Sequence, residues 1–319
     1  MSIDNTTMLA TVQRYLDERR GLGFKMRCGS ELLRFARYAD ARGHRGPLTL
    51  DLQLDWAQDG VLACGPATWH RRLKVLRPFS KYYRQFEPES VVPDAFTFGR
   101  GHQRLAPHIY FEYEIGALLQ AAGQLTPIGS LRPVTYQTLF GLLASTGMRV
   151  SEARNLQADD VDLRNGWLVI RQTKYRKSRR LPLHASVVQA LREYEIIRDC
   201  TVPRTAGMAF FLSQAGTPLT QSIVNHTFGL LRRKLAWVPR GGHPMPRIHD
   251  MRHTFAVRRM QRWHEDGTTM DQCLFWLCTY LGHAKISDTY WYLTGTPQLM
   301  EQVGIKFERF ALGKEANHA

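Results

Sequence analysis

Four segments among the first ninety residues carry apolar side chains at the three- and four-residue spacing of an α-helix. They begin near Met8, near Leu32, just after Thr49 and near Ala67. Polar and charged residues stand between the apolar ones, as on helices that cover a small core. We therefore expect an all-helical domain over residues 1–90.

Over residues 91–107 the helical pattern disappears, and proline and glycine become frequent. Such a composition is typical of a segment between two domains. The segment also contains Arg100 and Arg104, which make it basic. We place a linker here and a second domain over residues 108–319.

The second domain combines helices with one short β segment. Strand-forming residues at 167–170 and 180–183 flank a polar turn at 175–178, which is the pattern of a hairpin. Ser151 is placed to cap a short helix before the hairpin. Further helices are expected at about 112–122, 134–145, 185–198, 220–235, 249–263 and 270–281. The predicted fold is mainly α with a small β-sheet: an all-helical N-terminal domain and a mixed α/β second domain.

The composition adds a positive charge that both domains share. The chain has 43 Lys and Arg against 28 Asp and Glu, a net charge of +15, and residues 1–104 and 105–319 are each net basic. This balance favours a polyanionic partner such as nucleic acid. No apolar run approaches the roughly 20 residues that span a bilayer, and the N-terminus lacks a signal-peptide pattern. We expect a cytoplasmic protein that does not bind membranes.

The helix expected at 67–86 has one apolar face and one basic face. Arg71, Arg72 and Lys74 belong to the basic face. Two interpretations stay open from these residues alone: a solvated charged surface, or a helix laid against phosphates.

Residues 146–152 read Thr-Gly-Met-Arg-Val-Ser-Glu, which places Arg149 in a turn between two helices. Taken alone, this is a helix-ending glycine followed by a surface arginine. A guanidinium in a turn is also well suited to phosphate, because its planar fork donates two hydrogen bonds to one group.

The expected hairpin is strongly basic. Six of the ten residues from Arg171 to Arg180 are Lys or Arg. A charge run is usually a solvated surface, but the tip of a hairpin can also enter a groove of DNA.

Residues 249–256 read His-Asp-Met-Arg-His-Thr-Phe-Ala. His249, Arg252 and His253 stand at i, i+3 and i+4, so they share a helix face. The His-x-x-x-His pair also invites a zinc-hydrolase interpretation, but Asp250 stands where that motif needs glutamate. The five cysteines are scattered, without a Cys-x-x-Cys pair, and suggest no zinc site or disulfide framework. We expect no metal and no cofactor.

Residues 281–283 read Leu-Gly-His, and Tyr292 follows nine residues after His283. A tyrosine has a pKa of about 10, so it needs cations and a base around it to act as a nucleophile. Tyr290 is the competitor, but two residues on a helix point about 200° apart. The spacing favours Tyr292 and leaves Tyr290 and Trp291 to pack.

In order and spacing these motifs resemble the active site of the tyrosine recombinases, the phage integrase family. The resemblance is strong over residues 105–319 and weaker over 1–104, where it implies a core-binding domain that holds DNA. It implies the following roles: Arg149, Arg252 and His283 bind the scissile phosphate, Glu152 supports Arg149, Lys174 protonates the leaving 5′ oxygen, His249 is the acid/base partner, and Tyr292 is the nucleophile.

The resemblance also implies partners. The partner would be double-stranded DNA, so the protein would be associated with the nucleoid. Four protomers would assemble on two duplexes, and the free protein would be a monomer. We expect the following side chains to contact DNA: Arg71, Arg72, Lys74, Arg100, Arg104, Arg176, Lys177 and Arg179. An apolar stripe of Leu299, Val303, Phe307 and Phe310 is expected to dock on a neighbouring protomer.

The expected activity is DNA recombination, as in the integration or transposition of a mobile element. Three alternatives remain: a type IB topoisomerase-like enzyme, which rotates a strand instead of exchanging it; a recombinase relative that only binds DNA as an accessory protein; and a zinc hydrolase.

Overall fold

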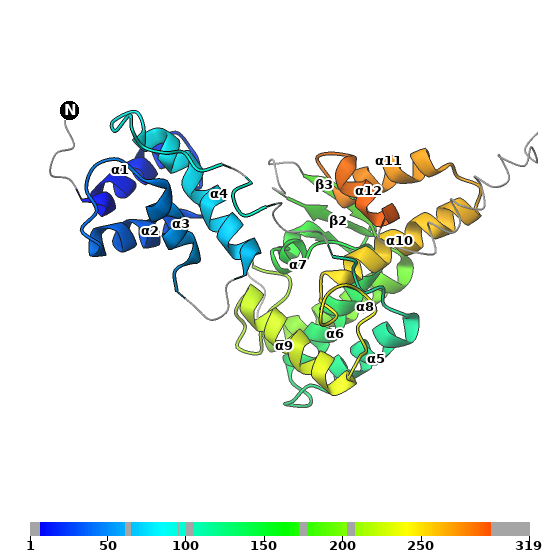
Figure 1. The fold of residues 1–319 in the computed structure, drawn as a ribbon. Coiled ribbons are helices and arrows are strands. Elements are labelled where there is room, and N and C mark those ends of the chain that lie inside the picture. Colours follow the sequence, from blue (N-terminus) through cyan, green and yellow to red (C-terminus); the bar gives the residue numbers. More distant parts are fainter. Residues whose placement is uncertain are drawn as a thin grey trace, which may run out of the picture. The chain divides into compact units, whose positions relative to one another are not determined.

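The computed structural model describes residues 7–60, 65–94, 96–99, 105–171, 178–202 and 208–294. The chain forms two compact units, residues 1–104 and 105–319 (Figure 1). The boundary between them falls within the stretch where we placed the linker. The start of that stretch belongs to the first unit, because the Val91 N–H donates to the Leu48 carbonyl and Gln53 donates to the Val91 carbonyl.

The first unit is helical in its described part. Its helices are α1 (Met8–Gly21), α2 (Gly29–Ala41), α3 (Leu50–Gln58) and α4 (Pro66–Tyr83). Thr7 and Thr49 accept N–H groups at the starts of α1 and α3, which satisfies part of each helix end. The core gathers one face from each helix, with Leu16, Phe35 and Phe79 fully buried.

Arg72 corrects one prediction. Its side chain is only 4% exposed, and its Nη1 donates to the carbonyls of Trp56, Ala57 and Asp59 at 3.3, 3.0 and 2.7 Å. It therefore closes the end of α3 and does not form part of a DNA-facing surface. Arg71 and Lys74 are exposed on the same helix.

The second unit adds a small antiparallel sheet to a helical framework. Its elements are α5 (Glu112–Gly123), α6 (Leu131–Thr146), α7 (Val150–Arg154), η1 (Ala158–Asp160), β1 (Val161–Asp162), β2 (Trp167–Ile170), β3 (Arg179–Pro182), α8 (Ala185–Thr201), α9 (Gln221–Leu235), α10 (Asp250–Glu265), α11 (Met270–Leu281) and α12 (Ser287–Thr294). The strand order is β1-β2-β3, and Leu168 pairs with Leu181. The fold class is as predicted, while β1 and α12 were not foreseen.

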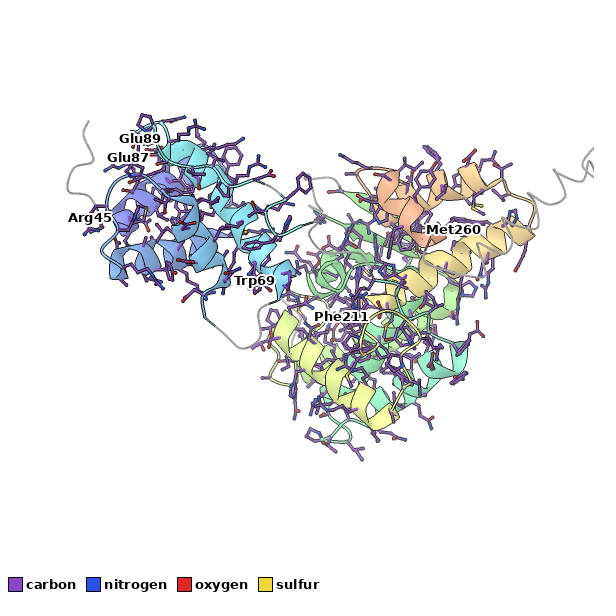
Figure 2. The ribbon with its side chains drawn as sticks, viewed as in Figure 1. Arg45, Trp69, Glu87, Glu89, Phe211 and Met260 are labelled. Carbon is purple, nitrogen blue, oxygen red and sulfur yellow. The ribbon has the colours of Figure 1, made fainter. Side chains whose placement is uncertain are left out.

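Two apolar clusters hold this unit together. The larger surrounds α6, which packs against α5, α8 and α10, and includes the fully buried Phe211 (Figure 2). The smaller joins α10, α11 and α12 and includes Met260 (Figure 2) and Tyr292. The second cluster thus places the C-terminal tyrosine against the helix that carries Arg252. Among the described helices, none is long and apolar enough to cross a membrane.

Replacing Arg72 by alanine should lower the free energy of unfolding by about 2 to 3 kcal/mol, because three backbone carbonyls lose their donor. Urea unfolding followed by tryptophan fluorescence measures this change. The Arg71→Ala variant is the matched control and should stay within about 0.5 kcal/mol of the parent. An Arg72→Ala protein of unchanged stability but weakened DNA binding would contradict the assignment.

Candidate active site

The turn between α6 and α7 presents Arg149. Gly147 ends α6 with a φ of 61°, and a Cβ there would lie 2.4 Å from the ring of Phe255, so this position requires glycine. Arg149 is the residue that caps α7, and Ser151 lies inside the helix, which corrects our prediction that Ser151 would cap it. The turn leaves the Arg149 side chain about one-third exposed.

Glu152 holds Arg149 in two ways. One carboxylate oxygen accepts the Arg149 backbone N–H at 2.9 Å, and the other accepts its Nη1 at 2.9 Å. The backbone contact is the half of a capping box in which the carboxylate at the third helical position accepts the N–H of the N-cap residue. The guanidinium contact holds the Arg149 side chain at the start of α7.

Arg179 shares the same carboxylate. Its Nη1 and Nη2 donate to the two Glu152 oxygens at 3.2 and 2.9 Å, and its Nε donates to the Tyr280 carbonyl at 3.0 Å. Burial alone would raise the pKa of Glu152, but the bonds and charge of Arg179, with those of Arg149, hold it below its usual value. The Arg179 side chain is 13% exposed. We predicted an outward DNA contact for Arg179, and the structure corrects this by turning it inward.

Arg252 lies at the centre of the site and is buried. Its Nη1 donates to the Gly147 carbonyl at 2.8 Å, while its Nη2 donates to the Leu281 carbonyl and to His283 Nε2, both at 2.9 Å. It therefore joins the end of α6 to the end of α11. Burial lowers the pKa of Arg252, and the nearby hydroxyl of Tyr292 acts in the opposite direction.

His283 follows Gly282, which ends α11 with a φ of 66°. Arginine has no acceptor, so His283 Nε2 must accept from Arg252 and its proton must lie on Nδ1. Nδ1 lies 2.8 Å from the Thr289 hydroxyl, which fixes the ring from the other side. Burial, and then the charge of Arg252, lowers the pKa of His283 to about 4.

Tyr292 lies among histidines. Its ring stacks on His283 with centroids 5.9 Å apart, and it meets the edge of His253 at 5.2 Å. Tyr292 is 5% exposed, whereas Tyr290 is 46% exposed. Our expectation that Tyr290 would pack was wrong, and its neighbour Trp291 packs against the smaller cluster.

His249 stands immediately before α10, with its ring centroid 5.0 Å from that of His253. It keeps exposed surface, yet loss of water around the ring, followed by the charge of Arg252, lowers the pKa of His249 to about 4. Burial lowers the pKa of His253 to about 3. Both rings are therefore neutral at pH 7.

The zinc-hydrolase alternative is disfavoured by the state of Asp250. This carboxylate is fully buried, and it accepts Arg247 Nη2 at 2.7 Å and the Arg247 backbone N–H at 2.8 Å. It is engaged in closing the loop before α10 and has no path to act as a general base. Within the described residues, no three His, Cys, Asp or Glu side chains gather as a metal site.

An open pocket of about 500 Å³ lies beside Arg149 and His249. Gln221, Asn225 and Arg232 of α9 also line it, together with Arg247 from the loop before α10. The pocket brings Arg149, Arg247 and His249 to one open surface. Neither Arg247 nor Thr289 was predicted as part of the site, and only the folded chain brings them to it.

Several predicted residues fall outside the described part of the chain. These are Arg100, Arg104, Lys174, Arg176, Lys177 and the C-terminal stripe of Leu299, Val303, Phe307 and Phe310. Their roles stay predictions.

Residues 112–298 match the family model described as the phage integrase family. The chain belongs to the phage integrase family. It is 38% identical over 309 residues to y4rB of Sinorhizobium fredii, a protein classed as an integrase/recombinase, covering 95% of this chain and 98% of that one. The tyrosine recombinase XerC of Neisseria meningitidis is 32% identical over 157 residues, 48% of this chain and 45% of that protein.

Solved integrase-family structures share the fold. The Tn1549 transposon integrase in complex with transposon right end DNA superposes with a TM-score of 0.67 and 19% identity, over 96% of this chain and 100% of that one. The XerH site-specific recombinase in a post-cleavage complex with palindromic difH gives 0.65 and 20%, over 87% and 78%. At 19–20% identity, these two superpositions show a shared fold and nothing more.

The low pKa of His253 predicts how stability depends on pH. Unfolded histidine binds a proton near pH 6.5 and the folded ring does not, so the stability present above that pH is lost as the pH falls towards 4. The free energy of unfolding should therefore fall between pH 7 and pH 5 in the parent. In the His253→Asn variant this fall should be smaller by about 1 to 2 kcal/mol.

Urea unfolding at the two pH values checks this prediction. His226→Asn, which changes an exposed histidine on α9, is the control and should lose as much as the parent. An equal loss in the parent and the His253→Asn variant would contradict the placement of His253.

Proposed function

We propose that this protein is a site-specific DNA recombinase that cuts and rejoins DNA strands through a 3′-phosphotyrosine intermediate. The observation that supports this most is the position of Tyr292, buried against His253 and His283 and close to Arg252. A tyrosine surrounded in this way has cations to stabilise an anion and neutral rings to take its proton. Family membership supports DNA as the substrate class, because the similar proteins y4rB and XerC carry the names of recombinases.

The first step exchanges one phosphodiester for another. The Tyr292 oxygen attacks the phosphorus, a P–O bond to Tyr292 forms, and the P–O5′ bond breaks. The tyrosine proton passes to a base, for which the neutral His249 is a candidate, and Lys174 supplies a proton to the leaving 5′ oxygen. Attack by a 5′ hydroxyl of a second strand reverses the step, so the bond energy is kept and ATP is not needed.

The cations stabilise the transition state. As the phosphorus becomes five-coordinate, charge builds on its non-bridging oxygens, and the partly exposed Arg149 is the group that can donate to them without rearrangement. Arg252 and His283 are bonded to each other and to neighbouring groups in the free protein, so they would have to exchange some of these bonds to donate to the phosphate. The arriving negative charge also favours protonated imidazole, which raises the pKa of His249 and His283 from their low values in the free protein. DNA binding would thus make the histidines able to hold the protons that the reaction moves.

Strand exchange between two duplexes needs four cleavages, which fits one protomer at each. We therefore propose a tetramer on DNA that assembles from free protomers at the nucleoid.

DNA from the flanks of the gene is the natural source of a substrate, because a mobile element is bounded by its own recombination sites.

Replacing Tyr292 by phenylalanine should abolish the covalent protein–DNA complex, because the attacking oxygen is removed. The assay is a nicked suicide duplex resolved on a denaturing gel. Tyr290→Phe is the matched control and should form the complex at the parental rate. A complex formed by Tyr292→Phe would disprove the assignment. No complex with the parent, despite tight DNA binding, would favour an accessory binder.

Replacing Arg149 by lysine should slow cleavage by about 10²- to 10³-fold, because the ammonium cannot reproduce the two-pronged contact of the guanidinium. Single-turnover cleavage at saturating DNA measures this rate. A parental cleavage rate in Arg149→Lys would show that Arg149 does not contact the phosphate.

Supercoil relaxation without any recombinant product, measured on the parent, would favour the topoisomerase alternative.

A further inference from the structure

Arg179 occupies an unexpected place for a residue of a basic hairpin. It is the first residue of β3 and pairs with Ile170, whose side chain is buried. Residues two apart on a strand share a face, so Arg179 faces the same way as the buried Leu181, and Arg180 faces the other way. Arg180 is exposed, while Arg179 is 13% exposed.

The guanidinium of Arg179 is fully engaged with protein. Its two terminal nitrogens hold both oxygens of Glu152 in a two-pronged pair, and its Nε holds the Tyr280 carbonyl at 3.0 Å. A Cβ at position 282 would lie 2.9 Å from Nη1, so Gly282 is also shaped around this side chain. A group with these partners is not free to bind DNA phosphate.

These contacts connect two parts of the site that are distant in sequence. On one side, Glu152 holds both the backbone N–H and the Nη1 of Arg149. On the other side, Tyr280 lies in the last turn of α11, two residues before Gly282 and three before His283. Arg179 thus fixes the turn that presents Arg149 relative to the turn that presents His283.

We propose that Arg179 is a positioning residue for DNA cleavage, acting on Arg149 through Glu152 and on His283 through the end of α11. Its contribution is to geometry at the phosphate and not to DNA affinity. An error of about 1 Å in such a site can cost about 10²-fold in rate. The proposal rests on the recombinase function, since strand cleavage is the reaction that it serves.

The test compares Arg179→Ala and Arg179→Lys with Arg180→Ala, a control from the next position on the same strand. The probe is a nicked duplex carrying the site that the parent protein protects in a footprint of the DNA flanking its gene. Two quantities are measured: the dissociation constant over a range of salt, and the single-turnover cleavage rate at saturating DNA.

For Arg179→Ala we expect a cleavage rate lower by about 10²-fold, with a dissociation constant within about twofold of the parent and an unchanged salt slope. Arg179→Lys keeps one contact and should retain an intermediate rate. Added guanidinium ion should restore part of the Arg179→Ala rate, which a loss of folding would not allow. In a Glu152→Gln background, the Arg179→Ala change should lower the cleavage rate by a smaller factor than it does in the parent, because Arg179 and Glu152 act through the same contact.

A phosphate contact would give the opposite pattern. Affinity would fall, the salt slope would drop by about 1, and the rate at saturation would stay parental. That result, or a parental rate and affinity in Arg179→Ala, overturns the proposal. If Arg179→Ala does not fold, the same comparison is decided by Arg179→Lys and Glu152→Gln. If the parent forms no covalent complex, the recombinase function itself fails, which is a distinct outcome.

Discussion

The site depends on one buried guanidinium, that of Arg252. Its hydrogen bonds to the carbonyls of Gly147 and Leu281 and to His283 join three motifs, one of them 105 residues and the other about 30 residues away from Arg252 in the chain. A buried cation requires compensation by nearby acceptors, and here the ends of α6 and α11 provide them. The same contacts that solvate Arg252 therefore bring together the Arg149 turn, the His283 turn and the surface on which Tyr292 packs.

In the free protein, the charges around Arg149 and Arg252 favour the binding of an anion. Glu152 is shared by Arg149 and Arg179, and three histidines with lowered pKa values stay neutral beside Arg252. A phosphate entering beside Arg149 would reduce the mutual repulsion of these cations and favour protonated imidazole. Binding of the phosphate and protonation of the histidines would thus be coupled.

Most helices could be predicted from the sequence, because their apolar spacing is local, although α12 was not foreseen. The relation of Glu152 to Arg149 came from the resemblance to the recombinases and not from spacing. Arg72 could have been predicted as buried, since it stands at helical spacing between Trp69 and Leu76; its charge led us to place it outside. The inward turn of Arg179 and the contact of Thr289 with His283 depend on how the strand and α12 meet α11. Contacts of that kind are set by tertiary packing, which no local pattern encodes.

The central claim concerns one bond between protein and DNA, and mass spectrometry of the trapped complex tests it most directly. After digestion of the covalent complex by protease and nuclease, we expect a nucleotide joined through its 3′ phosphate to the peptide that contains Tyr292, with a free 5′ hydroxyl on the departing strand. A nucleotide joined to Tyr290 or to any other residue, or joined through a 5′ phosphate, would contradict the account.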